Sequence, residues 1–294
     1  MIGPDAALAV CRFLHDASVM FVWGASAYLA VLVPPALALD VGRRLRSTLT
    51  AAIAFAVATT IAALPIQVAT VGEGWDDALN SETVGSVLFA TSVGTAWLFQ
   101  MAAAVILLST WMVSGLDRSS ATAVAAALSA ICITLIGHAV MQSGGLGALH
   151  RLNDAVHILA AGAWLGGLVP LFLILAVKEP EYRSEVDLAL TRFSTAGQVI
   201  VGLVLVSGIA NTALVLRKWP IDWSSPYQAL LAAKIAAVGV MTGLALINRY
   251  IQLPRVHRDG SHALQQISMA TVAEIGLGLT AIGLVSVFGI LDPV

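Results

Sequence analysis

Long apolar runs, separated by short polar segments, dominate the pattern of this chain. A helix needs roughly 20 apolar residues to cross about 30 Å of hydrocarbon, and eight stretches reach that length. They cover approximately residues 9–33, 48–71, 85–114, 121–143, 153–177, 194–216, 226–251 and 269–291. Backbone groups cannot stay unpaired in lipid, so these stretches are predicted to be helices. The pattern therefore predicts an all-α fold, a polytopic membrane bundle of about eight transmembrane helices.

Composition supports a membrane protein over a soluble one. Hydrophobic residues make up 59% of the 294 residues and charged residues only 11%, which is more apolar than a soluble core of this size can bury. The formal net charge of −2 suggests neither a nucleic acid nor an acidic substrate as a partner. We expect residues 1–294 to form a single transmembrane domain.

The distribution of Lys and Arg predicts the orientation in the membrane. The connections after the first, third, fifth and seventh predicted helices are basic, and the connection after the second is purely acidic. The basic connections hold Arg43, Arg44, Arg46, Arg118, Lys178, Arg183, Arg192, Arg249, Arg255 and Arg258. By the positive-inside rule, both termini are predicted to be periplasmic. No basic segment precedes the first apolar run, so we expect that helix to be retained rather than cleaved as a signal peptide.

Three histidines lie near the predicted outer ends of three different helices. They are His15, His138 and His157, and Met141 follows His138 by one helical turn. Imidazole binds both Cu(II) and Cu(I), and a thioether favours Cu(I), so this set predicts a copper site. The simpler alternative is that each histidine only hydrogen-bonds to a neighbouring helix.

Other polar groups inside the apolar runs fall in the same outer half. Charged groups at this depth cost about 2.5–3.5 kcal/mol on insertion scales and need a structural or functional reason. The predicted supporting residues are Asp16, Asp154, Trp164, Asn211 and Lys234. Asp154 and Trp164 share the helix face of His157. Lys234 is expected to pair with Asp16 or Asp154, to extend toward the membrane surface, or to act as a charge that responds to a bound cation.

The remaining unusual residues receive simpler interpretations. Cys11 and Cys132 are far apart and are predicted to be small buried residues, although Cys11 is one turn from His15. Glu274 is expected to lie at the inner interface or, alternatively, to belong to an inner exit. His257 and His262 fall in a basic inner loop and are expected to be solvated. No nucleotide-binding loop or catalytic triad order is present, and the chain is not predicted to be an enzyme.

Several short motifs resemble those of the copper resistance D (CopD/PcoD) family. In residues 190–292, the sixth to eighth predicted helices, they are Arg192-Phe193-Ser194, Ser207-Gly208-Ile209 with Asn211, Tyr227, Leu230-Leu231 with Lys234, Asn248-Arg249 and Pro254-Arg255. Earlier in the chain, residues 12–15, 137–139 and 157–168 extend the resemblance. Gln228 stands where the family often has Gly.

The resemblance implies a protein of the bacterial inner membrane that handles copper. Such a protein is expected to move copper ions from the periplasm to the cytoplasm, in cooperation with a periplasmic copper carrier of the CopC type. A copper chaperone or assembly factor without transport would use the same outer histidines. A second class of function also stays open, because paired histidines on neighbouring helices can hold a haem for electron transfer.

Overall fold

The computed structural model describes residues 2–137, 142–177, 179–216, 222–256 and 260–293, and every regular element in these ranges is a helix. Eight segments are long and apolar enough to cross a membrane. They are α1 (Pro4–Val31), α2 (Pro35–Val71), α4 (Ser92–Ser109) with η1 (Thr110–Met112), α5 (Leu116–Cys132) with η2 (Ile133–Leu135), α6 (Gly144–Leu175), α7 (Arg183–Leu216), α8 (Pro226–Ile247) with η5 (Asn248–Gln252) and α9 (Leu253–Arg255), and α10 (Gly260–Phe288). The predicted all-α bundle with eight spans is confirmed. The predicted membrane orientation stays a prediction.

Four of the helices, α2, α6, α7 and α10, begin nine or more residues before the predicted apolar runs, and two of these differences affect residues considered above. Helix α2 begins at Pro35, so the basic residues expected in the first loop lie on its first turns. Proline is compatible with the first turn of a helix, where its missing N–H has no partner to lose. Helix α6 begins at Gly144, which has a φ of +66°. His150, which falls between the fourth and fifth predicted runs, is therefore a helical residue with only 2% exposure.

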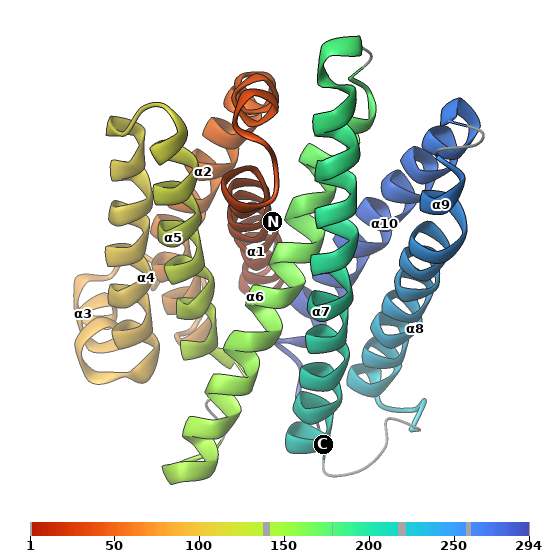
Figure 1. Cartoon of the computed structure of the whole chain (residues 1–294). Coiled ribbons are helices and arrows are strands. Elements are labelled where there is room, and N and C mark those ends of the chain that lie inside the picture. The colour runs from red at the N-terminus through yellow and green to blue at the C-terminus, as the bar shows by residue number, and fades with distance from the viewer. Residues whose placement is uncertain (1, 138–141, 178, 217–221, 257–259, 294) are drawn as a thin grey trace.

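The third predicted span is divided. A short helix, α3 (Ser81–Ala90), precedes α4, and Thr91 between them has an extended backbone. The Thr91 hydroxyl accepts a hydrogen bond from the Gly94 amide at 3.1 Å, which caps α4. Figure 1 shows α3 beside α4 at one edge of the molecule.

Helix α1 lies at the centre of the bundle and packs on α2, α5, α6 and α10 (Figure 1). It crosses α6 closely, because a Cβ added at Gly24 would overlap the carbonyl oxygen of Gly162, and one at Gly166 would overlap that of Met20. Small residues at such crossings let two backbones approach in a membrane.

Two apolar clusters flank this crossing. One cluster joins α1, α2, α4 and α5. We call these four helices the N-terminal half-bundle. The other joins α1 and α2 to α6, α7 and α8. We call α6, α7, α8 and α10 the C-terminal half-bundle, in which α7 packs on α6 and α8 packs on α10. The candidate functional side chains are distributed over both half-bundles.

Candidate functional site

His15 on α1 faces the N-terminal half-bundle. Its Nδ1 lies 3.1 Å from the hydroxyl of Thr59 on α2. That hydroxyl has one hydrogen, which it donates to the carbonyl of Phe55 at 2.7 Å or of Ala56 at 3.0 Å. A hydroxyl that donates to one of these carbonyls accepts from His15, which corresponds to the tautomer with the ring proton on Nδ1. In that tautomer the other ring nitrogen, Nε2, carries the lone pair; this nitrogen is buried and has no hydrogen-bond partner among the described residues.

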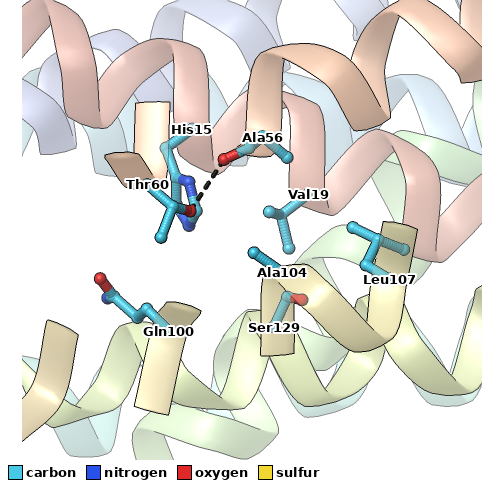
Figure 2. Close-up of a pocket in the computed structure, with 8 residues that line it drawn as sticks. All are labelled: His15, Val19, Ala56, Thr60, Gln100, Ala104, Leu107 and Ser129. Carbon is cyan, nitrogen blue, oxygen red and sulfur yellow. Dashed lines mark hydrogen bonds between the residues drawn. The ribbon is translucent and has the colours of Figure 1, made fainter. Parts of the chain in front are cut away.

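The lone pair of His15 borders a narrow polar space between α1, α2, α4 and α5. Figure 2 shows the residues around this space, with Thr60, Gln100 and Ser129 as its polar members. The space has essentially no room for a water molecule. Cys11 lies nearby, since its thiol donates to the Thr59 carbonyl at 3.3 Å. A buried, unpaired imidazole nitrogen is unusual and is the form of histidine that binds a metal ion.

His157 on α6 has the same arrangement in the C-terminal half-bundle. Its Nδ1 lies 2.9 Å from the hydroxyl of Ser207 on α7, and that hydroxyl donates to the carbonyls of Leu203 and Val204. The ring proton is again assigned to Nδ1, so Nε2 carries the lone pair. Gly208 makes room for the ring, because a Cβ there would lie 3.2 Å from the His157 Cε1.

A polar network lies on α6 and α7 around His157. Asn153 donates to the Asn211 side-chain oxygen at 2.7 Å, and Asn211 donates to Asp154 at 2.9 Å. The structure thus brings together two of the predicted supporting residues, Asp154 and Asn211. Asn211 uses both its side-chain oxygen and its side-chain nitrogen in this series of hydrogen bonds, which orients its donor toward the Asp154 carboxylate.

The charged residues at this depth lie in one another's electrostatic field. Lys234 feels the charge of Asp154, and Asp16 feels those of Arg12 and Asp154. Among the described residues, Lys234 makes no ion pair within 4.0 Å, and its ammonium lies 5.9 Å from the ring centroid of Phe288. Of the three expectations for Lys234, a direct ion pair with Asp16 or Asp154 is not observed.

The described chain includes only part of the predicted copper ligand set. His138 and Met141 lie outside the described residues. His15 and His157 face different neighbours, α2 for the first and α7 for the second. Within the described ranges, no three His, Cys, Asp or Glu side chains come together as a metal site. The four-residue site that unites His15, His138, His157 and Met141 stays a prediction.

Sequence reasoning missed the role of His150. Its Nδ1 lies 2.8 Å from the Gln142 side-chain oxygen, and the Gln142 amide donates to the Leu214 carbonyl at 2.9 Å. This contact ties the start of α6 to the end of α7. Of the two histidines expected in the basic loop, His262 is exposed, as expected, and His257 lies outside the described residues.

Trp164 and Glu274 form a second polar site that the sequence did not reveal. The Trp164 indole N–H donates to Glu274 at 3.2 Å, and the Asn248 amide donates to the other carboxylate oxygen, also at 3.2 Å. Glu274 is 2% exposed and lies at the midpoint of α10, so its side chain is buried within the bundle rather than exposed at a helix end. Its position as the sixth residue of the predicted apolar run 269–291 was the available signal.

Comparisons with known proteins agree on one family. Residues 2–148 match the family model described as copper resistance protein D-like, N-terminal domain, and residues 187–288 match copper resistance protein D. No solved structure is significantly similar to the chain.

Curated relatives carry consistent names. The chain is 28% identical to the inner membrane protein YebZ of Escherichia coli (strain K12), over 96% of this chain and 97% of that protein. It is 30% identical to the copper resistance protein D of Pseudomonas syringae pv. tomato, over 69% of each. It is 28% identical to the copper transport protein CutJ of Bacillus subtilis (strain 168), over 84% of this chain and 46% of that protein.

Proposed function

Because the chain belongs to the copper resistance protein D family, we propose that it moves copper ions inward across the bacterial inner membrane. The copper ion is the cargo of this protein rather than a resident cofactor. The names of two relatives, a copper resistance protein and a copper transport protein, support copper as the cargo. The name of a third supports the inner membrane as the location.

The arrangement of the histidines is the observation that most supports copper binding. In both His15 and His157, Nδ1 lies within hydrogen-bond distance of a hydroxyl, and in the tautomer with the proton on Nδ1 the other ring nitrogen, Nε2, carries the lone pair. A hydrogen bond from the far ring nitrogen is the usual support for a metal-binding imidazole. We propose that copper is taken up at the outer face by His15, His138 and His157, with Met141 as a soft ligand.

The supporting residues receive roles consistent with their contacts. Asp16 and Asp154 are anionic groups that attract a cation to this depth, and Asn211 holds Asp154 in place at 2.9 Å. Lys234 lies in the field of Asp154 and would offset its charge when no cation is bound. A change in the occupancy of the site can alter the balance of these charges.

We propose a periplasmic CopC-like carrier as the copper donor. The support is the family membership together with the predicted orientation, which turns the outer ends of α1 and α6 toward the periplasm. A static copper-binding or assembly protein would use the same histidines, so only a flux measurement separates it from a transporter.

The first test is the metal content of the purified full chain, loaded separately with Cu(I) and Cu(II), beside an absorption spectrum. We expect copper to be retained after removal of excess metal and to be lost in the triple variant His15→Ala, His138→Ala, His157→Ala. The exposed His262→Ala variant is the matched control and should keep its copper. Absence of copper from the wild type would overturn the proposal, and a strong Soret band would favour the haem alternative.

A further inference from the structure

A cavity of about 310 Å³ opens between α7 and the end of α8, beside α6 and α10. The contacts explain its position, since α7 packs on α6 and α8 packs on α10, which leaves a gap between the two pairs. It extends from the middle of the bundle toward the ends of α7 and α8 that are predicted to be cytoplasmic. Apolar side chains form most of the wall.

Glu274 and Trp164 close the end of this cavity that lies in the middle of the bundle. The carboxylate is buried, and its two hydrogen bonds come from neutral donors, the indole of Trp164 and the amide of Asn248. Among the described residues, no Lys, Arg or His lies within 4.0 Å of it. An isolated carboxylate buried inside a membrane-spanning bundle needs a positive charge, which must come from a proton or a bound cation.

The groups at this end of the cavity fit a proton better than a metal ion. The Asn248 side-chain oxygen is buried and has no hydrogen-bond partner, so it and the Glu274 oxygens are the available acceptors. One carboxylate and one amide oxygen supply too few ligands for a dehydrated hard metal ion, which takes six or more oxygens. A proton needs a single acceptor and a route to water.

The cavity supplies the route to water. It has room for several water molecules, each of which occupies about 30 Å³ in the liquid. The opposite end of the cavity, which is predicted to face the cytoplasm, has a polar rim. There the Arg249 guanidinium donates to Ser194 at 2.9 Å, and Gln198 donates to the exposed Tyr250 at 2.9 Å. Asn248, Arg249 and Tyr250 all come from the π-helical turn η5, a feature often found at functional sites.

Few charged groups face Glu274 from the elements that pack around it. From η5 the titratable groups at the cavity are Arg249 and Tyr250, and from α6 only the neutral Trp164 reaches it. Helix α1 meets α10 with Arg12 at the opposite end, where the guanidinium donates to the Gly289 carbonyl at 3.0 Å. The charge state of Glu274 is therefore governed by the cavity and its two neutral donors.

We propose that Glu274 is a proton-binding site which exchanges protons through this cavity and couples their movement to the movement of copper. On release, the carboxylic O–H bond breaks and the proton passes to a cavity water as hydronium. The electron pair stays on the carboxylate, which the N–H groups of Trp164 and Asn248 stabilise; uptake reverses these steps. The coupling rests on the proposed function, whereas proton binding does not.

Infrared difference spectra between acidic and alkaline buffer test proton binding without any copper. The full chain in liposomes should show a carboxylic C=O band that disappears in Glu274→Gln and shifts in Trp164→Phe, which removes one hydrogen bond. The exposed Glu82→Gln is the matched control and should leave that band unchanged. A spectrum that is the same in Glu274→Gln and wild type would overturn the proton site.

Copper-dependent proton movement, followed with a trapped pH-sensitive dye in the same liposomes, tests the coupling. We expect wild type to move protons when copper is supplied, and Glu274→Gln to reduce that movement at least 10-fold while it still binds copper. If Glu274→Gln moved protons at the same rate as wild type, the coupling would be refuted. Wild type that binds copper yet moves neither copper nor protons would refute transport and coupling together, and the infrared band would still decide the proton site.

Discussion

At the scale of single residues, hydroxyl groups set the chemistry of the two described histidines. Thr59 and Ser207 each lie within hydrogen-bond distance of a helix carbonyl and of the neighbouring imidazole. When the hydroxyl donates to the carbonyl, it accepts from the imidazole Nδ1–H and orients the ring. Each ring then presents Nε2 as a lone pair, which is the property that a copper ligand needs.

Thr59→Val tests this support at His15, because valine has nearly the same shape and no acceptor. The Nδ1–H of His15 would lose its partner, and an unsatisfied buried donor costs about 1–3 kcal/mol. We expect copper affinity to fall about 10–100-fold, as is usual when the second hydrogen bond of a metal-binding His is lost. Thr70→Val on the exposed end of α2, where the hydroxyl bonds only to Ile66, should leave affinity unchanged in a competition titration.

Gly208→Ala tests the position of the His157 ring. The added Cβ would lie 3.2 Å from Cε1, so the imidazole must shift by a few tenths of an ångström. We expect about 10-fold weaker copper binding in the same titration. Gly202→Ala on the same helix meets nothing within 4 Å and is the control; equal affinities in the two variants would show that ring position is unimportant.

At the scale of elements, the sequence predicted the spans well and their ends poorly. Apolar length alone identifies a membrane helix, which is why all eight spans were found. Their ends depend on local signals that hydropathy does not see, such as Pro35 at the start of α2 and the extended Thr91 before α4. The hydrogen bond between Trp164 and Glu274 joins helices α6 and α10, and no pattern within one helix predicts which distant helix it will contact.

The crossing of α1 and α6 makes its own prediction. In Gly24→Ala the new methyl group would overlap backbone atoms of Gly162 and Gly166, which cannot move aside without separating the helices. Overpacking of this kind costs about 1–3 kcal/mol or more. We expect a clearly lower midpoint of thermal unfolding in detergent for this variant. Gly239→Ala, with open space around the new Cβ, should match wild type, and a Gly24→Ala variant as stable as this control would contradict the close crossing.

At the scale of the whole molecule, polar groups lie at successive depths. His157 and Trp164 are seven residues apart on α6, about 10 Å along the helix axis, and Glu274 accepts from the second of them. In the predicted orientation, His157 and the Glu274 carboxylate therefore lie in sequence along one direction of travel, which a static copper store would not require.

That direction depends on the orientation predicted from Lys and Arg, which reporter fusions measure. A phosphatase that is active only in the periplasm should be active when fused after residue 294. The same reporter should be inactive when fused to a chain truncated after Arg183, the first residue of α7. The reverse result would mean that the histidines lie on the cytoplasmic side of the membrane, and it would contradict inward movement from the periplasm.

Copper flux into liposomes that contain the full chain is the most direct test of the central claim. The account predicts copper accumulation by wild type and by His262→Ala, and a loss of at least 10-fold in the triple variant His15→Ala, His138→Ala, His157→Ala. Comparable flux in wild type and the triple variant, with equal amounts of folded protein, would contradict a route through the outer histidines.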